Sequence, residues 1–243
     1  MLTLFALAPL AAAAENQVLV WDITLDGREV GHRTETVKYL TNTDGSVRRI
    51  LEVWTEVDGS ILGFKYSFRE RLTADISGDV ASFHAVADLS GSVTEVQARR
   101  GATSWTITTN FDGRETTREW PANSIDLSTA DLIDPATSTP IGQFDQVRVL
   151  SAETGDIYEG PVKRLGESTV VVDAKTLVVE GYSWTSEDGV EGKLWYTPDG
   201  FLAKYEMEVM GRRLIGTLAD PPPAGTDGNP VSGSATGITE VNL

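Results

Sequence analysis

The 243-residue sequence contains no cysteine and only two histidines, His32 and His84. The lack of cysteine excludes a disulfide framework, a thiolate zinc site, iron–sulfur ligation and a cysteine nucleophile. A hydrolase triad would need a histidine beside a serine and a carboxylate, and the chain has no G-x-S-x-G elbow. His84 alternates with Phe83 and Ala85, which predicts that it points to solvent. The sequence therefore assigns no catalytic, cofactor-binding or metal-binding residue.

Basic residues are also few, with 20 Lys and Arg against 36 Asp and Glu and a formal net charge of −16. A chain of this charge is repelled by phosphate backbones and anionic lipid, so nucleic-acid binding is disfavoured. The acidity mainly indicates solubility. It is compatible with a cationic partner or divalent cations, but it selects neither.

Long apolar runs are missing as well. Leu2–Leu10 is apolar, but a transmembrane helix needs about 20 such residues, so no transmembrane segment is predicted. The small-residue block Ala11–Ala14 follows, which predicts that residues 1–14 are a secretory signal cut after Ala14. No Lys or Arg precedes the run, and a buried strand or helix is the alternative interpretation. The signal predicts location in the periplasm or outside the cell.

What the chain does contain is the pattern of antiparallel β-structure. Asp-Gly, a dipeptide typical of tight hairpin turns, occurs seven times. Between these turns lie runs with a period of two, clearest in Ile61–Leu72, where Leu62, Phe64, Tyr66, Phe68 and Leu72 share one face. The first group of predicted strands comprises Gln17–Leu25, Arg28–Leu40, Val47–Val57, Ile61–Asp75, Val80–Leu89, Val93–Arg100, Thr103–Asn110 and Arg114–Trp120.

An irregular segment, Pro121–Phe144, separates this group from a second one and is expected to hold a short helical turn after Ser128. The second group comprises Phe144–Ser151, Ser168–Asp173, Leu177–Glu187, Gly192–Tyr196, Phe201–Val209 and Arg212–Leu218. We therefore predict a single all-β domain over residues 15–218, with sub-sheets at about 17–120 and 144–218. Its expected form is an antiparallel open barrel or a strongly curved β-sandwich of about 14 strands. Residues 219–243 are rich in Pro and Gly and are predicted to be a disordered tail.

Carboxylates and calcium ligands give weak signals. Two facing Asp or Glu residues in an aromatic cleft would serve a glycosidase, but no spacing among the acidic residues singles out a pair. The segments 42–45 and 226–229 offer oxygen ligands without the spacing of a calcium loop, and hairpin turns explain them equally well.

The aromatic residues are the most suggestive feature. Six tryptophans are spread over both halves of the chain and would either fill a core or line a binding cavity. A curved antiparallel sheet with an apolar concave side is one way to build such a cavity. The candidate ligand-binding residues are Trp21, Leu62, Phe64, Tyr66, Phe68 and Trp184.

Four segments resemble a known family when taken in order. They are Val20–Gly31 (VWDITLDGREVG), Leu62–Tyr66 (LGFKY), Leu132–Gly142 with its Thr137 and Thr139, and Leu194–Gly200 (LWYTPDG). The order resembles domain-of-unknown-function family 6134, a family of uncharacterised bacterial exported proteins. The resemblance implies an open β-barrel similar to the DUF3108-like proteins, with a sheet wrapped around a hydrophobic space, and it implies no catalytic residues.

Three functions remain open at this point. The first is a non-enzymatic binding module that holds an apolar small molecule or lipid on the concave sheet. The second is a structural or protein-interaction protein of the cell envelope that uses an acidic face or an exposed strand edge. The third is a polysaccharide hydrolase, which would need two facing carboxylates and at least one raised pKa.

Overall fold

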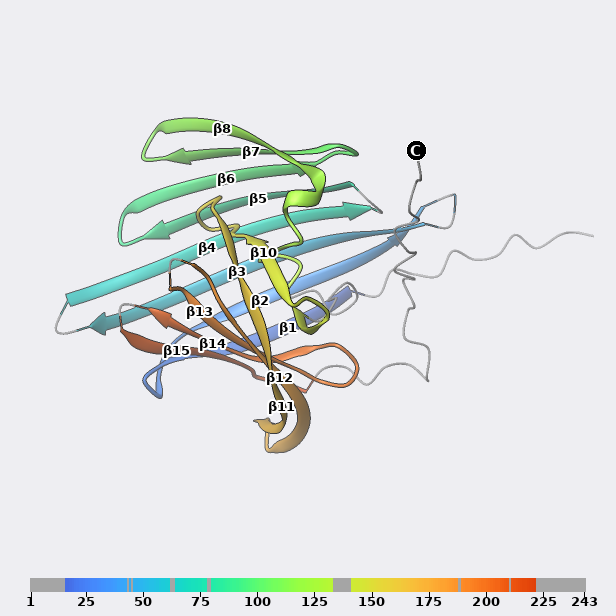
Figure 1. The fold of residues 1–243 in the computed structure, drawn as a ribbon. Helices are drawn as coiled ribbons and strands as arrows, with labels where there is room; N and C mark the ends of the chain where they lie inside the picture. Colours follow the sequence, from blue (N-terminus) through green and yellow to red (C-terminus); the bar gives the residue numbers. More distant parts are fainter. Residues whose placement is uncertain are drawn as a thin grey trace, which may run out of the picture.

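The computed structural model describes residues 16–221, except 43, 45, 62–63, 78–79, 133–140, 188 and 210. These residues form fifteen strands in one mostly antiparallel sheet (Figure 1). In chain order the strands are β1 (Asn16–Leu25), β2 (Arg28–Thr41), β3 (Val47–Ile61), β4 (Phe64–Ser77), β5 (Val80–Leu89), β6 (Ser92–Arg100), β7 (Ser104–Phe111), β8 (Arg114–Pro121), β9 (Leu127–Ser128), β10 (Gln146–Leu150), β11 (Ile157–Val172), β12 (Lys175–Thr185), β13 (Glu191–Tyr196), β14 (Leu202–Val209) and β15 (Arg212–Leu218). The predicted signal, residues 1–14, and residues 222–243 of the predicted tail lie outside the described residues.

The sheet is open and continuous. Its order runs from β8 back to β1, then from β15 back to β9, so β8 and β9 are its two end strands. The two groups of strands predicted from the sequence do not form separate sub-sheets, because β1 pairs with β15 from Trp21 and Leu218 onward. This pairing joins the two ends of the domain, and local alternation carries no information about it. The predicted all-β class and open-barrel architecture are confirmed.

Two strands of the second half were missed or shortened. Residues 157–167 belong to β11, although Gly160, Pro161 and Gly166 interrupt the apolar alternation there. The pairing with β12 shifts its register between Arg164 and Gly166, and Gly166 has a φ of 90°. This bulge lets the strand continue through a sequence that reads as a loop. β9 has only two residues, which is too short to show a period.

Asp-Gly turns behave as expected at most of the described positions. Asp26-Gly27 and Asp112-Gly113 have positive φ at both residues, the conformation of a type I′ hairpin turn. Asp58-Gly59 is an exception, because it lies within β3, where Gly59 pairs with Tyr66 of β4. The predicted helical turn after Ser128 is present as a single turn, in which the Leu132 N–H donates to the Ser128 carbonyl at 3.3 Å and Ser128 and Asp131 exchange the two reciprocal hydrogen bonds of a capping box. It forms no helix as far as Leu132, and residues 133–140 lie outside the described residues.

The sheet curls so that its later strands cross the inner face of its earlier ones (Figure 1). Apolar side chains from β2–β7 form one core cluster together with Ile125, Ala130, Leu150 and Ala152. A second cluster joins β1 to β10–β15 around the fully buried Trp21. The inner face of the sheet is thus covered by strands from the far end of the same sheet, while the barrel stays open because its end strands β8 and β9 do not pair.

Aromatic side chains repeatedly cover a glycine on the neighbouring strand. A side chain on any of these glycines would overlap or press against the aromatic ring. The ring protects glycine backbone that would otherwise weaken the strand. The cross-strand pairs are Tyr66 with Gly59, Tyr205 with Gly216, Trp195 with Gly181, and Trp184 with Gly192.

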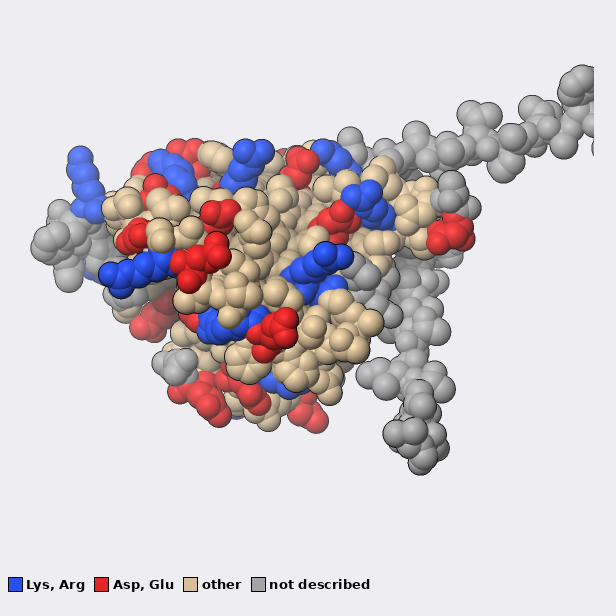
Figure 2. Space-filling view, turned by 90° about the horizontal axis from the view of Figure 1, so that it is seen from above, with Lys and Arg blue, Asp and Glu red and all other residues tan. Residues whose placement is uncertain are grey.

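Acidic residues do not form a single patch on the face of the molecule seen from above (Figure 2). Basic and acidic side chains are interspersed over the face shown in Figure 2. Exposed ion pairs account for part of this mixture, such as Arg48 with Asp75 at 2.5 Å and Lys38 with Glu52 at 2.9 Å. The arrangement is that of a solvated exterior.

Candidate functional site

Strand register defines two adjacent rows of residues across the inner face. We call the first the apolar row, and its described members include Tyr205, Ile23, Val57, Phe68 and Leu89. We call the second the charged row, and it includes Trp21, Arg33, Thr55, Glu70 and Phe111. The rows lie side by side because their members are two residues apart along each strand.

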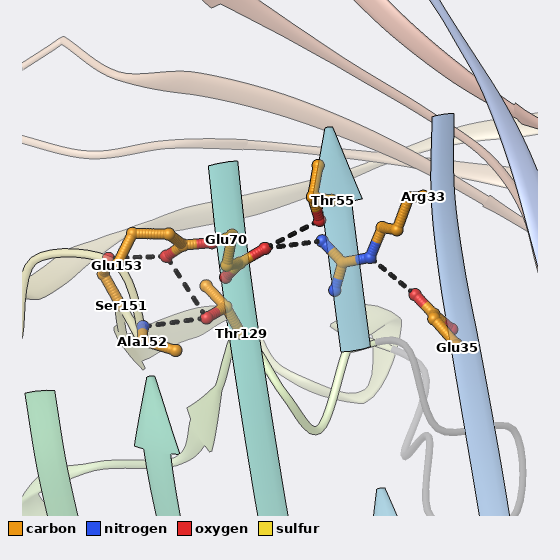
Figure 3. Close-up of polar contacts among 8 residues, drawn as sticks. All are labelled: Arg33, Glu35, Thr55, Glu70, Thr129, Ser151, Ala152 and Glu153. Carbon is orange, nitrogen blue, oxygen red and sulfur yellow. Dashed lines mark hydrogen bonds and ion pairs between the residues drawn. The ribbon is translucent and has the colours of Figure 1, made fainter. Parts of the chain in front are cut away.

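A buried ion cluster occupies the charged row (Figure 3). The guanidinium Nε of Arg33 donates to Oε1 of Glu35 at 2.8 Å, and its NH1 lies 3.6 Å from Oε2 of Glu70. The Thr55 hydroxyl donates to the same Glu70 oxygen at 2.9 Å. The Arg33 side chain is 11% exposed and the two carboxylates are 1% exposed. Strand alternation on β2, β3 and β4 directs all four side chains inward.

A third carboxyl reaches this cluster from the segment after β10. The Ser151 hydroxyl donates to Oε2 of Glu153 at 2.8 Å, and the Thr129 hydroxyl lies 3.4 Å from the same oxygen. Thr129 also accepts a hydrogen bond from the backbone of Ala152 at 2.9 Å. These contacts hold the half-buried Glu153 beside Glu70 (Figure 3).

Burial and like charge raise the pKa values of the inner carboxyls. Burial raises the pKa of Glu35 to about 7, although the charge of Arg33 opposes the shift. Burial also raises the pKa of Glu70 to about 7, and the neighbouring Glu153 adds to this effect. The pKa of Tyr205 rises to about 12, again through burial. At neutral pH Glu35 and Glu70 therefore retain part of the protons that they would lose in water.

The cluster holds more acceptors than donors. The Arg33 guanidinium pairs with two of the three carboxyls, and Oε1 of Glu70 is buried with no hydrogen-bond donor among the described residues. A buried carboxylate oxygen without a donor is unfavourable. Glu70 and Glu153 therefore need a proton or a cation between them.

Four of the predicted ligand-binding residues lie on the inner face. Phe68 belongs to the apolar row and Trp21 to the charged row. Tyr66 and Trp184 are each two residues beyond the apolar row, and the Tyr66 hydroxyl and the Trp184 indole NH are buried without a partner among the described residues. Of the two remaining predicted residues, Phe64 begins β4 and its side chain is not described, and Leu62 lies outside the described residues.

The sequence analysis missed the ion cluster, although one signal was present. Glu70 stands between Phe68 and Leu72 on the apolar face of its strand, where alternation demands an apolar residue. Arg33 and Glu35 likewise share a face with the buried Val37. A charged residue at a core position is rarely tolerated without a partner, so these three positions together pointed to a buried ion pair.

The other chemical features are peripheral. His84 lies on the outer face, as predicted, where its Nε2 is 2.8 Å from Glu95. Among the described residues, no group of three or more His, Cys, Asp or Glu is placed to hold a metal ion. In the same part of the chain, no helix is long and apolar enough to cross a membrane. A hollow of about 620 Å³ lies beside Gly59, on which Tyr66 packs, and it also touches Leu25, Asp58 and Arg212.

The fold and the buried cluster together define an all-β protein built on one open, curled sheet. The family model "Domain of unknown function (DUF6134)" matches residues 21–215, so the chain belongs to that family. This confirms the resemblance seen in the order of the four sequence segments. No curated protein matches the chain.

The fold is also seen among solved structures. One of them is the crystal structure of a beta-barrel-like protein of domain of unknown function DUF1849 from Brucella abortus, with a TM-score of 0.56 and 11% sequence identity. The match covers 86% of this chain and 98% of that one. At this identity the likeness concerns the fold alone.

The raised carboxyl pKa values predict a measurable pH dependence of stability. Because Glu70 has a pKa of about 7 in the folded chain against 4.5 ordinarily, the folded state binds more protons between these values. The free energy of unfolding therefore falls as pH rises from about 4.5 to 7. We expect Glu70→Gln to reduce this fall by up to about 3 kcal/mol, measured by urea unfolding between pH 5 and 8.

The exposed Glu115 of β8 provides the control. Glu115→Gln makes the same change in net charge without touching the cluster. It should leave the pH dependence of the wild-type chain unaltered. Equal slopes for wild type and Glu70→Gln would contradict the assignment of the raised pKa to Glu70.

Proposed function

We propose that the protein is a non-enzymatic binding module that holds an apolar or lipid-like ligand against the inner face of its sheet. The observation that carries the proposal is a set of apolar side chains that face inward and still reach solvent. Leu89 of the apolar row is 47% exposed and Phe111 of the charged row is 50% exposed. Exposed apolar surface beside polar groups is characteristic of ligand sites.

Two of the predicted ligand-binding residues, Tyr66 and Phe68, lie next to this exposed apolar surface. Phe68 pairs directly with Leu89 across β4 and β5, and Tyr66 follows two residues along the same strand. The half-buried Phe68 and Tyr66 thereby extend the exposed apolar surface toward the hollow beside Gly59. A ligand lying on this surface would cover Tyr66, Phe68, Leu89 and Phe111, which we call the inner apolar strip.

The double variant Leu89→Ser/Phe111→Ser tests the proposal. Both side chains are about half exposed, so their loss should leave the fold intact while it removes apolar contact with the ligand. Burial of such side chains is worth about 1.5–3 kcal/mol each, so dodecanol should bind at least tenfold more weakly. Isothermal titration of the full chain, stripped of co-purified lipid, measures the affinity.

Val18→Ser/Trp54→Ser is the matched control, because both side chains lie on the outer face and are 56% and 46% exposed. It should bind dodecanol as the wild type does. Equal weakening of dodecanol binding in both double variants would contradict the proposal. Native mass spectrometry of protein from its own host should show a bound lipid-like mass, and it would also show whether the mature chain begins at Glu15.

Two other functions are less well supported. An interaction protein would use the end strand β8, whose eight residues are all exposed. Its Arg114, Arg118 and Pro121, however, are typical of edges that are guarded against pairing. A hydrolase would use the raised pKa of Glu70, but a residue that is 2% exposed offers no room for a polysaccharide chain.

A further inference from the structure

We infer that the ligand of the inner apolar strip carries a cationic amine, whose ammonium group binds between the Glu70 and Glu153 carboxyls. This inference rests on the proposed function, because it names the chemistry of the polar end of the same ligand. It would make the protein a receptor for an amphipathic amine, not for a fatty acid or a phospholipid.

The balance of charges in the cluster favours a cation. The groups that face Glu70 are Arg33 and Glu35 of β2, Thr55 of β3, Glu153 after β10 and Tyr205 of β14. The guanidinium among them is already shared by two carboxylates. An anionic head group would therefore meet three carboxyls with no free cation, whereas an ammonium would meet acceptors that lack donors.

The unpartnered oxygen of Glu70 points to a ligand independently of that charge count. The Glu70 residue is 2% exposed, and its Oε1 has no N–H or hydroxyl donor among the described residues, so the neighbouring Glu153 carboxyl can pair with Glu70 only through a shared proton. An ammonium group brings three donors without requiring any acceptor in return. It can therefore donate to Glu70 and Glu153 together and satisfy both carboxyls.

The charged row also connects the ion cluster with the exposed end of the inner face. From Glu70 the row continues through the buried Ala87 and the half-buried Thr94 to the exposed Phe111, three strands away. At about 4.8 Å per strand this distance is roughly 14 Å, and Leu89 of the apolar row lies alongside. Glu153 is half-buried and precedes the exposed Thr154, so the head-group end is not sealed from solvent.

Binding should be linked to proton release. Without ligand, Glu70 retains a proton at neutral pH because burial and Glu153 disfavour its charged form. The ammonium keeps its own protons, and the carboxyl proton passes to water when the cation replaces it. The affinity for an amine should consequently rise between pH 6 and pH 8.

The experiment compares three probes that share one apolar chain: dodecylamine, dodecanol and dodecanoate, each below its aggregation concentration. With the full chain at pH 8, dodecylamine should bind at least tenfold more tightly than dodecanol, and dodecanoate should bind most weakly. Titration at pH 6, where Glu70 still carries its proton, in two buffers of different ionisation enthalpy should show proton release with dodecylamine alone. The dodecylamine affinity should rise at least threefold from pH 6 to pH 8.

Variants separate the head group from the apolar strip. Glu70→Gln and Glu153→Gln should each lower the affinity for dodecylamine at least fivefold and leave that for dodecanol unchanged. Glu115→Gln, on the exposed β8, should change neither. Because Glu153 is half-buried on a loop, its variant remains informative if the Glu70 variant fails to fold.

The possible results distinguish the two proposals. Equal affinity for dodecylamine and dodecanol, or tighter binding of dodecanoate, overturns the amine inference and leaves the binding function standing. Binding of none of the three probes overturns the proposed function itself. Tight amine binding that survives both glutamate substitutions places the ammonium elsewhere and also overturns the inference.

Discussion

Arg33→Met is expected to lower the free energy of unfolding by about 3–5 kcal/mol at pH 8. The Arg33 guanidinium is the partner of both Glu35, at 2.8 Å, and Glu70, at 3.6 Å. Methionine fills much of the same volume but leaves two carboxylates buried without a cation, and their desolvation is then uncompensated. Urea unfolding followed by tryptophan fluorescence measures the loss.

The same substitution should cost much less at pH 5. Glu35 and Glu70 have pKa values of about 7 in the folded chain, so both are largely neutral at pH 5 and need no cation. Arg48→Met is the control, because Arg48 pairs with Asp75 on the exposed face, and it should change stability little at either pH. An Arg33→Met loss of equal size at pH 5 and pH 8 would show that packing, not charge, is responsible.

Most of the fold was predictable because an antiparallel strand with one buried face alternates apolar and polar residues along the sequence. The run from Glu70 to Ile76 shows this best, since the buried residues 70, 72, 74 and 76 alternate with exposed or half-buried ones. β11 was shortened because Gly160, Pro161 and Gly166 resemble a loop until the register shift beside Gly166 is seen. The joining of β1 to β15 depends on contacts between residues some 190 positions apart, which no local window contains.

The candidate site was only half predictable. The inward direction of Trp21, Tyr66, Phe68 and Trp184 was predictable because these residues follow the period of the strands. The charged row was not predicted, because the charged side chain of Glu70 interrupts the apolar alternation of its strand and resembles an irregularity of the pattern. Glu153 could not have been found at all, since it comes from an irregular segment that reaches Glu70 only through the curling of the sheet.

The opening segment of the family resemblance has a structural explanation. In VWDITLDGREVG, Gly27 has a φ of 77° in the β1–β2 turn, a conformation that favours glycine. Gly31 meets a different requirement, because a Cβ at this position would overlap the backbone oxygen of Glu56 on β3. The two glycines therefore hold the strand that carries Arg33 and Glu35 against its neighbours.

Gly31→Ala is expected to destabilise the chain by about 3 kcal/mol or more, because the added methyl group meets backbone instead of a movable side chain. Relief requires β2 and β3 to separate beside Val57, two residues from the pairing of Arg33 with Thr55. The melting temperature should fall by roughly 10 °C, as measured by circular dichroism.

Alanine substitutions at two further glycines should cause smaller losses of stability than Gly31→Ala. Gly101→Ala adds a methyl group whose nearest neighbour is 3.7 Å away, so it should be close to neutral. Gly27→Ala meets no atom within 4 Å but must adopt a positive φ, which costs about 1–2 kcal/mol. The expected order of losses is thus Gly101, then Gly27, then Gly31. If Gly31→Ala were as mild as Gly101→Ala, the close approach of β2 to β3 would be wrong, and so would the placement of Arg33 opposite Thr55 on which the buried cluster depends.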